Sequence, residues 1–134
     1  MSDEARVYPI RSDLDIVAAR LAGRTLAQEV GFTGSDLIVI ATAISELARN
    51  IVLYARHGEI HLGAIEKGGL NGIEVIARDG GPGIEDVEQA MQDGFTTSHG
   101  LGLGLPGTRR LMDEFDLQTT KGQGTTVTCR KWVR

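Results

Sequence analysis

Two polar side chains on one predicted helix stand at a spacing that favours joint chemistry. In the stretch ELARN, Glu46 and Asn50 lie four residues apart, so both project from the same helix face. That face is rotated away from the main apolar stripe, which favours an exposed, solvated Glu–Asn pair. Val39, Ala43 and Leu53 share the Glu46 side, however, and a helix with two apolar-lined faces usually borders a cleft with one of them. The residues alone leave both interpretations open.

An aspartate closes a predicted strand immediately before a glycine-rich turn. In GIEVIARD the alternation places Ile73, Val75 and Asp79 on one side of the strand. A carboxylate in register with core residues needs a donor, since burying it unpaired is costly. Either Asp79 accepts hydrogen bonds from the amides that follow it and shapes the turn, or it accepts one from a ligand amine. In the second case Gly81 and Gly83 let the backbone approach that ligand closely.

Three glycines precede the next predicted helix in the stretch SHGLGLGLPG. Gly100, Gly102 and Gly104 alternate with leucines, but glycine weakens a strand interior, so the period of two does not predict a strand. Bare backbone amides ahead of a helix N-terminus can instead hold a phosphate, and Pro106 suits the first helical turn. The alternative is a flexible surface loop. The stretch lacks the Gly-Lys-Ser/Thr of a Walker loop and the strand setting of a dinucleotide-binding fingerprint.

The elements that position these residues alternate between helices and strands. In the first helix Leu14, Val17, Leu21 and Leu26 keep roughly helical spacing, and in the second a stripe from Leu37 to Ala55 does so. The pattern predicts an α+β two-layer sandwich with a mixed, mostly antiparallel sheet and helices on one face. The predicted elements are a strand over 6–11, helices over 12–31 and 35–56, a hairpin over 58–79, helices over 85–92 and 106–115, and two C-terminal strands.

Composition restricts the class of protein. The 134 residues suit one domain, 1–134, and the net charge of −4 argues against a nucleic-acid partner. A single cysteine, Cys129, excludes an internal disulfide. We find no apolar run of membrane-spanning length and no signal peptide, which predicts a cytoplasmic protein without a membrane partner.

The motifs ELARN, DGGPGI and GLGLGL, in this order, resemble those of the Bergerat-type (GHKL) ATP-binding fold, which includes gyrase-type ATPases, a heat-shock chaperone, mismatch-repair ATPases and histidine and serine kinases. The resemblance covers essentially the whole chain. It implies that Glu46 is the general base and Asn50 the Mg²⁺ ligand. It further implies that Asp79 accepts from the adenine amino group and that Thr125 shares this contact, often through water. Residues that would shape the pocket or hold the phosphates of ATP are Gly81, Gly83, Gly100, Gly102 and Gly104, beneath a mobile lid over about 95–99.

A closer resemblance extends into the connecting helices. The stretches DIVAAR, AISELARNI, DGFTTSHGLGLGLPGTRRLMDEF and KWVR look like those of RsbT-type switch kinases of the bacterial stressosome. That family implies ATP-dependent phosphorylation of serine or threonine on scaffold and antagonist proteins with STAS domains. It also implies release from the scaffold and activation of a downstream phosphatase. A homodimer is compatible with the fold, and apolar positions on the first helix are where its interface is expected.

Alternative functions are an anti-sigma factor kinase of the same fold and a non-catalytic, nucleotide-gated binding module. The intact Glu46–Asn50 pair favours catalysis, because a non-catalytic module would tolerate loss of Glu46. A base also favours a hydroxyl acceptor over a histidine, because an imidazole is already a nucleophile. The chain has no room for the phosphoacceptor helices of a histidine kinase or for a gyrase-type transducer domain. Three residues keep open roles: Arg109 and Arg110 pair with phosphate or form exposed ion pairs, and His99 is a solvated lid residue, a proton switch or a phosphate donor.

Overall fold

Five antiparallel strands form the sheet in this computed structural model, which describes residues 6–83 and 104–134. The strand order is β1-β2-β3-β5-β4, with β1 at an edge, as Pro9 predicted. Every neighbouring pair in the described residues is antiparallel, so the sheet is more uniform than the mixed one expected. The strands are β1 (Arg6–Ile10), β2 (Gly58–Lys67), β3 (Leu70–Asp79), β4 (Glu114–Thr120) and β5 (Gly124–Trp132).

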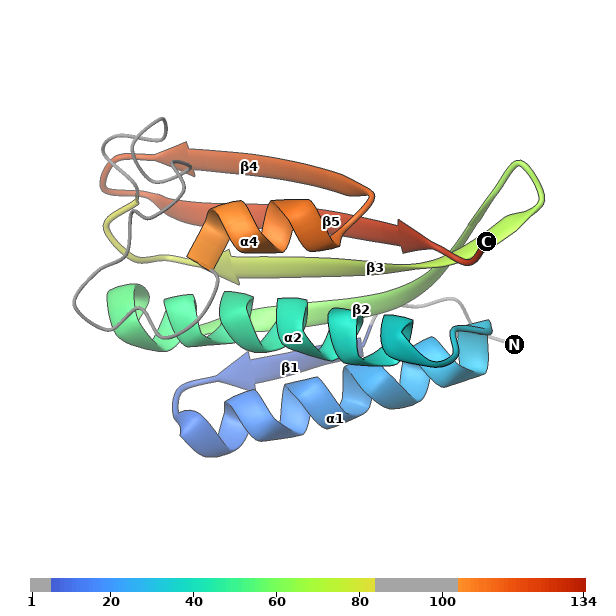
Figure 1. Cartoon of the computed structure of the whole chain (residues 1–134). Coiled ribbons are helices and arrows are strands. Elements are labelled where there is room, and N and C mark those ends of the chain that lie inside the picture. The colour runs from blue at the N-terminus through green and yellow to red at the C-terminus, as the bar shows by residue number, and fades with distance from the viewer. Residues whose placement is uncertain (1–5, 84–103) are drawn as a thin grey trace.

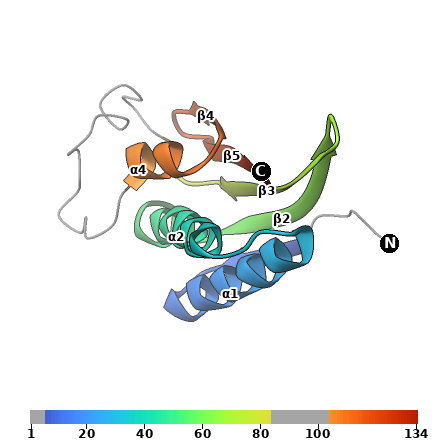
Figure 2. The same ribbon diagram turned by 45° about the vertical axis from the view of Figure 1, so that its right-hand side comes forward.

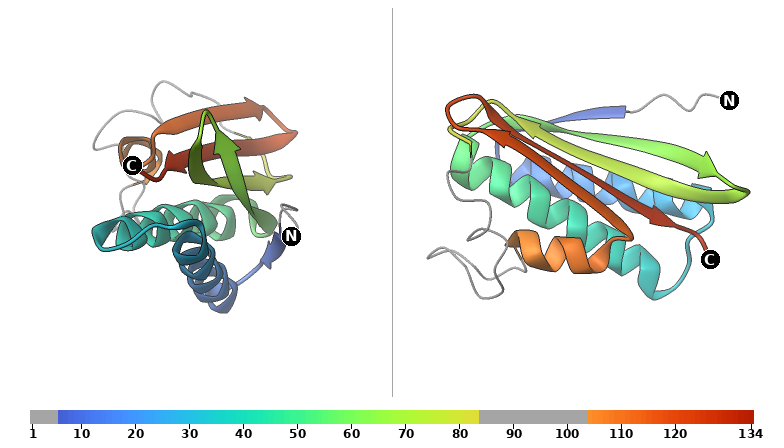
Figure 3. Two further views of the ribbon diagram at one scale, coloured as in Figure 1. Left: turned by 90° about the vertical axis from the view of Figure 1, so that its right-hand side faces the viewer. Right: turned by 90° about the horizontal axis from the view of Figure 1, so that it is seen from above.

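The helices form a second layer on one face of this sheet. They are α1 (Asp13–Val30), α2 (Ser35–Asn50), the π-helical turn η1 (Ile51–Ala55) that continues α2, and α4 (Gly104–Leu111). Figure 1 shows α1, α2 and α4 in front of the strands, and the turned views in Figures 2 and 3 keep them on the same side. The predicted two-layer α+β sandwich is therefore confirmed.

Helix α2 lies at the centre of the core. Its apolar stripe is buried from Leu37 through Ile44 to Ile51, and it packs toward the inner face of the sheet, where Ile73, Val75 and Ala77 of β3 are also buried. Contrary to the expectation from sequence, the 21 residues Ser35–Ala55 are long and apolar enough to cross a membrane, by length and composition alone. The buried central helix of a globular core has the same length and composition, and α2 with η1 is such a helix here.

The first helix buries a different face from the one its leucines suggested. Leu14, Val17 and Leu21 are exposed. The buried side is built mainly from small residues: a Cβ at Gly23 would lie 2.1 Å from Ile44 Cδ1, so glycine lets α1 approach α2 closely. Two larger side chains, Ile16 and Leu26, are buried on that side as well, so of the predicted stripe only Leu26 faces the core.

Two element boundaries also differ from expectation. The second helix does not remain α-helical to Arg56 but changes to the π-helical turn after Asn50. Helix α4 ends at Leu111 rather than at Phe115, which lies in β4, because the Asp113 amide already donates to the Arg130 carbonyl of β5 at 2.9 Å. The helix predicted over 85–92 lies outside the described residues.

Candidate ATP-binding and phosphoryl-transfer site

The predicted site residues come from elements that meet at one end of the molecule. The C-terminal half of α2 with η1, the end of β3, the β4–β5 turn and the start of α4 all lie toward the left of Figure 1. The hairpin β2–β3, turning at Gly68 and Gly69 with positive φ, brings the last residue of β3 back to this end. Residues separated widely in sequence are thus gathered in one region.

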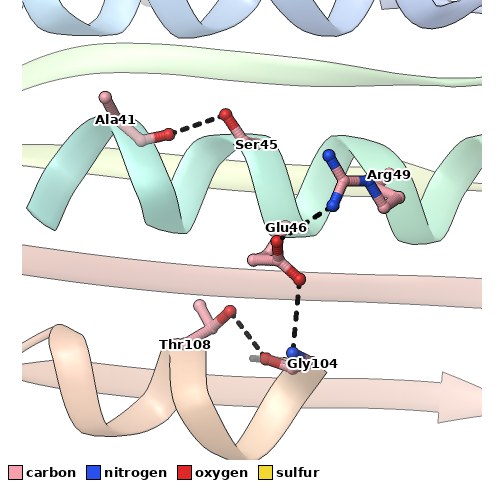
Figure 4. Close-up of polar contacts among 6 residues, drawn as sticks. All are labelled: Ala41, Ser45, Glu46, Arg49, Gly104 and Thr108. Atoms are coloured by element: carbon pink, nitrogen blue, oxygen red, sulfur yellow. Dashed lines mark hydrogen bonds and ion pairs between the residues drawn. The ribbon is translucent and has the colours of Figure 1, made fainter. Parts of the chain in front are cut away.

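Glu46 is buried, and its carboxylate is held by donors from two elements. Its Oε1 accepts a hydrogen bond from the Gly104 backbone N–H at 3.3 Å, and its Oε2 accepts one from Arg49 Nη1 at 3.3 Å (Figure 4). The interpretation as a solvated pair with Asn50 is therefore wrong, because α4 covers this face of α2. The structure instead places the carboxylate beside the last glycine of the predicted phosphate cradle.

Asn50 lies one turn further along α2 and is half-buried. Its side chain makes no hydrogen bond to Glu46 or to another described residue, so its carboxamide oxygen keeps its acceptor capacity within this part of the chain. The π-helical turn begins directly after it, and such turns are frequent at functional sites. No cluster of three His, Cys, Asp or Glu residues that could hold a metal occurs among residues 6–83 and 104–134.

Asp79 and Thr125 are direct cross-strand partners between β3 and β5. The Gly81 N–H donates to Asp79 Oδ1 at 2.9 Å, as the turn-forming interpretation requires. The other carboxylate oxygen, Oδ2, accepts no hydrogen bond from the described residues. Thr125 Oγ1 lies 3.0 Å from Thr119 Oγ1 on the neighbouring strand. One oxygen of Asp79 therefore shapes the turn while the other remains able to accept from a ligand.

An open hollow of about 290 Å³ lies at this end of the sheet. Its lining includes both members of the Asp79–Thr125 pair, with polar side chains of β4 around them. The remaining lining residues are Arg78, Gln118, Thr119, Thr120, Gln123, Gly124 and Thr126.

The glycines of the β3 turn are required by packing within the protein. A Cβ at Gly81 would lie 2.7 Å from the Ala55 Cβ of η1, and one at Gly83, where φ is 79°, would lie 2.5 Å from the Thr120 carbonyl oxygen. Sequence reasoning had attributed both glycines to close approach of a ligand. The structure shows that they also seat the turn against η1 and against the β4–β5 connection.

Several residues contribute that sequence reasoning did not select. Arg49 donates to Glu46, and its position three residues along the same helix was a usable signal. The buried Thr108 donates through Oγ1 to the Gly104 carbonyl at 2.9 Å. Gly124 has a φ of 103°, and a Cβ there would lie 2.1 Å from the Asp79 carbonyl oxygen, so only glycine brings β5 this close to β3.

The other predicted residues divide into two groups. Arg109 and Arg110 are both exposed in the last turn of α4. Gly100, Gly102, His99 and the lid predicted over 95–99 lie outside the described residues.

Comparison with known proteins agrees with this arrangement. Residues 10–131 match the model of the histidine kinase-like ATPase domain, and the chain belongs to this family. It is 52% identical to the serine/threonine-protein kinase RsbT of Bacillus subtilis (strain 168), over the full length of both chains. The predicted RsbT-type resemblance is thereby confirmed: the chain is a homologue of a serine/threonine-protein kinase and carries an ATPase domain.

More distant relatives share the fold and part of the sequence. The chain is 34% identical over 119 residues to the anti-sigma F factor of Caldanaerobacter subterraneus subsp. tengcongensis, an alignment that covers 86% of this chain and 83% of that one. A crystal structure of the RsbU and RsbW domains of a Mycobacterium tuberculosis protein superposes with a TM-score of 0.61 at 21% identity. That match covers 96% of this chain and 33% of the larger one, and it supports the fold.

Proposed function

We propose that this chain is a Mg-ATP-dependent serine/threonine protein kinase that phosphorylates STAS-domain scaffold and antagonist proteins and then activates a downstream phosphatase. The observation that carries the proposal is the buried Glu46 carboxylate, joined to the first amide of α4. A base adjoining the predicted phosphate cradle is the arrangement that transfer to a hydroxyl group requires. The 52% identity to RsbT supports the substrate and partner classes.

Asp79 and Thr125 would recognise the adenine ring. The free Oδ2 of Asp79 suits the exocyclic amine as donor, and Thr125 stands beside it as the cross-strand partner. This donor–acceptor match would select adenine over guanine, because guanine presents a carbonyl oxygen at the corresponding position. Gly81 and Gly83 would keep the turn next to the base. Gly100 and Gly102, with Gly104 beside them, would hold the phosphates of ATP, while the Gly104 N–H itself donates to Glu46 Oε1.

Mg²⁺ fits the chain at Asn50, where a half-buried carboxamide oxygen has no other partner among the described residues. Hard oxygen ligands suit this ion, and Mg²⁺ is commonly bound by one or two protein groups together with the phosphates of the nucleotide. When bound, the ion neutralises charge on the phosphates of ATP.

Glu46 would act on the acceptor protein. Its carboxylate takes the proton of a serine or threonine hydroxyl as that oxygen attacks the γ-phosphorus, and ADP leaves with the electrons of the broken bond. A base positioned in this way contributes about 10²–10⁴-fold to a rate. The step needs the carboxylate deprotonated, with a lone pair that its two hydrogen bonds leave open facing the acceptor.

Regulation by an anti-sigma mechanism is the second candidate, favoured by the 34% identity to an anti-sigma F factor. The higher identity to RsbT favours the switch kinase. A nucleotide-gated binding module without catalysis would not need Glu46.

We place the protein in the cytoplasm, where ATP and the proposed partners occur. The exposed Leu14, Val17 and Leu21 of α1 are the candidate contact in a homodimer.

Transfer of labelled phosphate from ATP to a STAS-domain protein tests the proposal, with wild type beside Glu46→Gln. We expect label on serine or threonine with the wild type, and loss of transfer with retained ATP binding in the variant. Tight ATP binding without transfer by the wild type would instead support the gated binding module. Capture of a sigma factor by the wild type would support the anti-sigma alternative.

A further inference from the structure

Arg49 is the side chain that completes the environment of the Glu46 carboxylate. One carboxylate oxygen is taken by the Gly104 amide of α4, and Arg49 Nη1 donates to the other. Figure 4 shows the guanidinium and the Gly104 amide on different sides of the carboxylate. Glu46 is therefore fixed between its own helix and the helix that covers it.

Neighbouring hydroxyl groups are directed elsewhere. Ser45 Oγ donates to the Ala41 carbonyl at 2.9 Å, and Thr108 Oγ1 donates to the Gly104 carbonyl at 2.9 Å (Figure 4). Neither competes for Glu46. Among the described residues, Arg49 is the side chain that donates a hydrogen bond to the Glu46 carboxylate.

The ion pair joins a buried group to a surface group. The side chain of Glu46 is 10% exposed and that of Arg49 is 41% exposed. A carboxylate removed from water needs compensating donors, whereas the guanidinium remains hydrated and costs little to hold there. Spacing of three residues on one helix lets the pair form without strain in the backbone.

We propose that Arg49 is a positioning residue for the catalytic base. Its guanidinium holds the Glu46 carboxylate in one orientation, with Oε1 toward the start of α4, where the phosphates and the acceptor hydroxyl would meet. The inference rests on the proposed kinase function, because it gives Arg49 its effect through Glu46. Small displacements of a reacting group lower rates strongly, so a base that rotates freely loses part of its contribution.

Arg49→Gln separates this role from a structural one. We expect kcat for phosphate transfer to fall about tenfold, a part of what a positioned base supplies. The KM for ATP should stay unchanged, because Arg49 acts through Glu46 and not on the nucleotide. Arg49→Lys keeps the charge and should recover much of the rate, although a lysine lacks the planar fork. Arg20→Gln, an exposed substitution on α1, is the matched control and should behave as the wild type.

The amide resonance of Gly104 in a ¹H–¹⁵N correlation spectrum gives a readout independent of activity. It should move in Glu46→Gln and in Arg49→Gln but not in Arg20→Gln. An unmoved resonance in Arg49→Gln would overturn the inference, even if no protein substrate were phosphorylated. With an active wild type, an unchanged or raised kcat in Arg49→Gln, or a raised KM for ATP at constant kcat, would overturn it as well. Absence of transfer by the wild type, with the Gly104 resonance moving as expected, would refute only the kinase function.

Discussion

Replacing Asp79 by asparagine separates its two roles, because the new side chain has nearly the same shape. An asparagine oxygen can keep accepting from the Gly81 N–H, which now donates to Asp79 Oδ1 at 2.9 Å. The position of the free Oδ2 becomes an NH₂ group, so the proposed acceptor for the adenine amine turns into a donor. The turn should therefore persist while the nucleotide contact is lost.

The expected magnitudes follow from these two changes. The Gly81 N–H would donate to a neutral amide oxygen instead of a charged carboxylate, which lowers the free energy of unfolding by about 1 kcal/mol. For a chain of this length that lowers Tm by about 4 °C. The asparagine NH₂ and the adenine amino group would both be donors, so neither would find an acceptor at this contact. The cost is about 1–3 kcal/mol, which corresponds to an ATP affinity about 5- to 150-fold weaker.

Isothermal titration with ATP, together with thermal unfolding, measures both quantities. Asp116→Asn provides the matched control, since Asp116 is exposed on β4 and carries the same chemical change. Unaltered ATP affinity in Asp79→Asn would refute the adenine contact. A variant that fails to fold would show that the carboxylate is chiefly structural, which would refute the separation of roles argued above.

Three other predictions concern stability. Gly124→Ala should lower the free energy of unfolding by about 1–3 kcal/mol in urea titrations, because its Cβ would overlap a carbonyl oxygen of β3 at a positive φ. Ile44→Ala, fully buried, should cost about 2–5 kcal/mol in the same assay, whereas the 61% exposed Ile38→Ala should cost less than about 0.5 kcal/mol. The Trp132 indole donates to Glu114, and that hydrogen bond is the main reason why the Glu114 pKa lies below its ordinary value of 4.5. A lowered folded-state pKa stabilises the fold above pH 4.5, and this stabilisation is lost as the pH falls through the folded-state pKa. When the pH is lowered from about 5 to about 3, the free energy of unfolding should therefore fall less in Glu114→Gln than in the wild type.

The fold class and most elements could be predicted from periodicity, because each depends on local sequence. The stripe through Ile44 identified the central helix, and the alternation ending at Asp79 identified a strand with its inner face buried. Periodicity predicted only part of the buried face of α1: Leu26 is buried, but Leu14, Val17 and Leu21 are exposed. There the buried face is chosen by how closely two helices approach, and Gly23, not a large apolar residue, permits that approach.

Residue types indicated the candidate site, but its contacts depend on tertiary structure. The partner of Glu46 is an amide 58 residues away, which becomes available only when α4 lies on α2. Pairing of Asp79 with Thr125 requires β5 to lie beside β3, and nothing in the local sequence of either strand specifies that neighbour. The motif resemblance supplied the roles of these residues, and the packing supplies their geometry.

The strand order has a consequence for folding during synthesis on the ribosome. Strand β5 lies between β3 and β4, so the partner of Asp79 is synthesised 46 residues after it (79 to 125) and joins the sheet after β4 has been made. Until β5 leaves the ribosome, β3 presents an unpaired edge, and such edges are prone to aggregation in nascent chains. The proposed adenine contact needs both Asp79 and Thr125, so ATP bound through it would not assist folding before that moment. Stabilisation by ATP would begin only when the sheet is complete, and the nascent chain would depend on chaperones or rapid pairing up to that point.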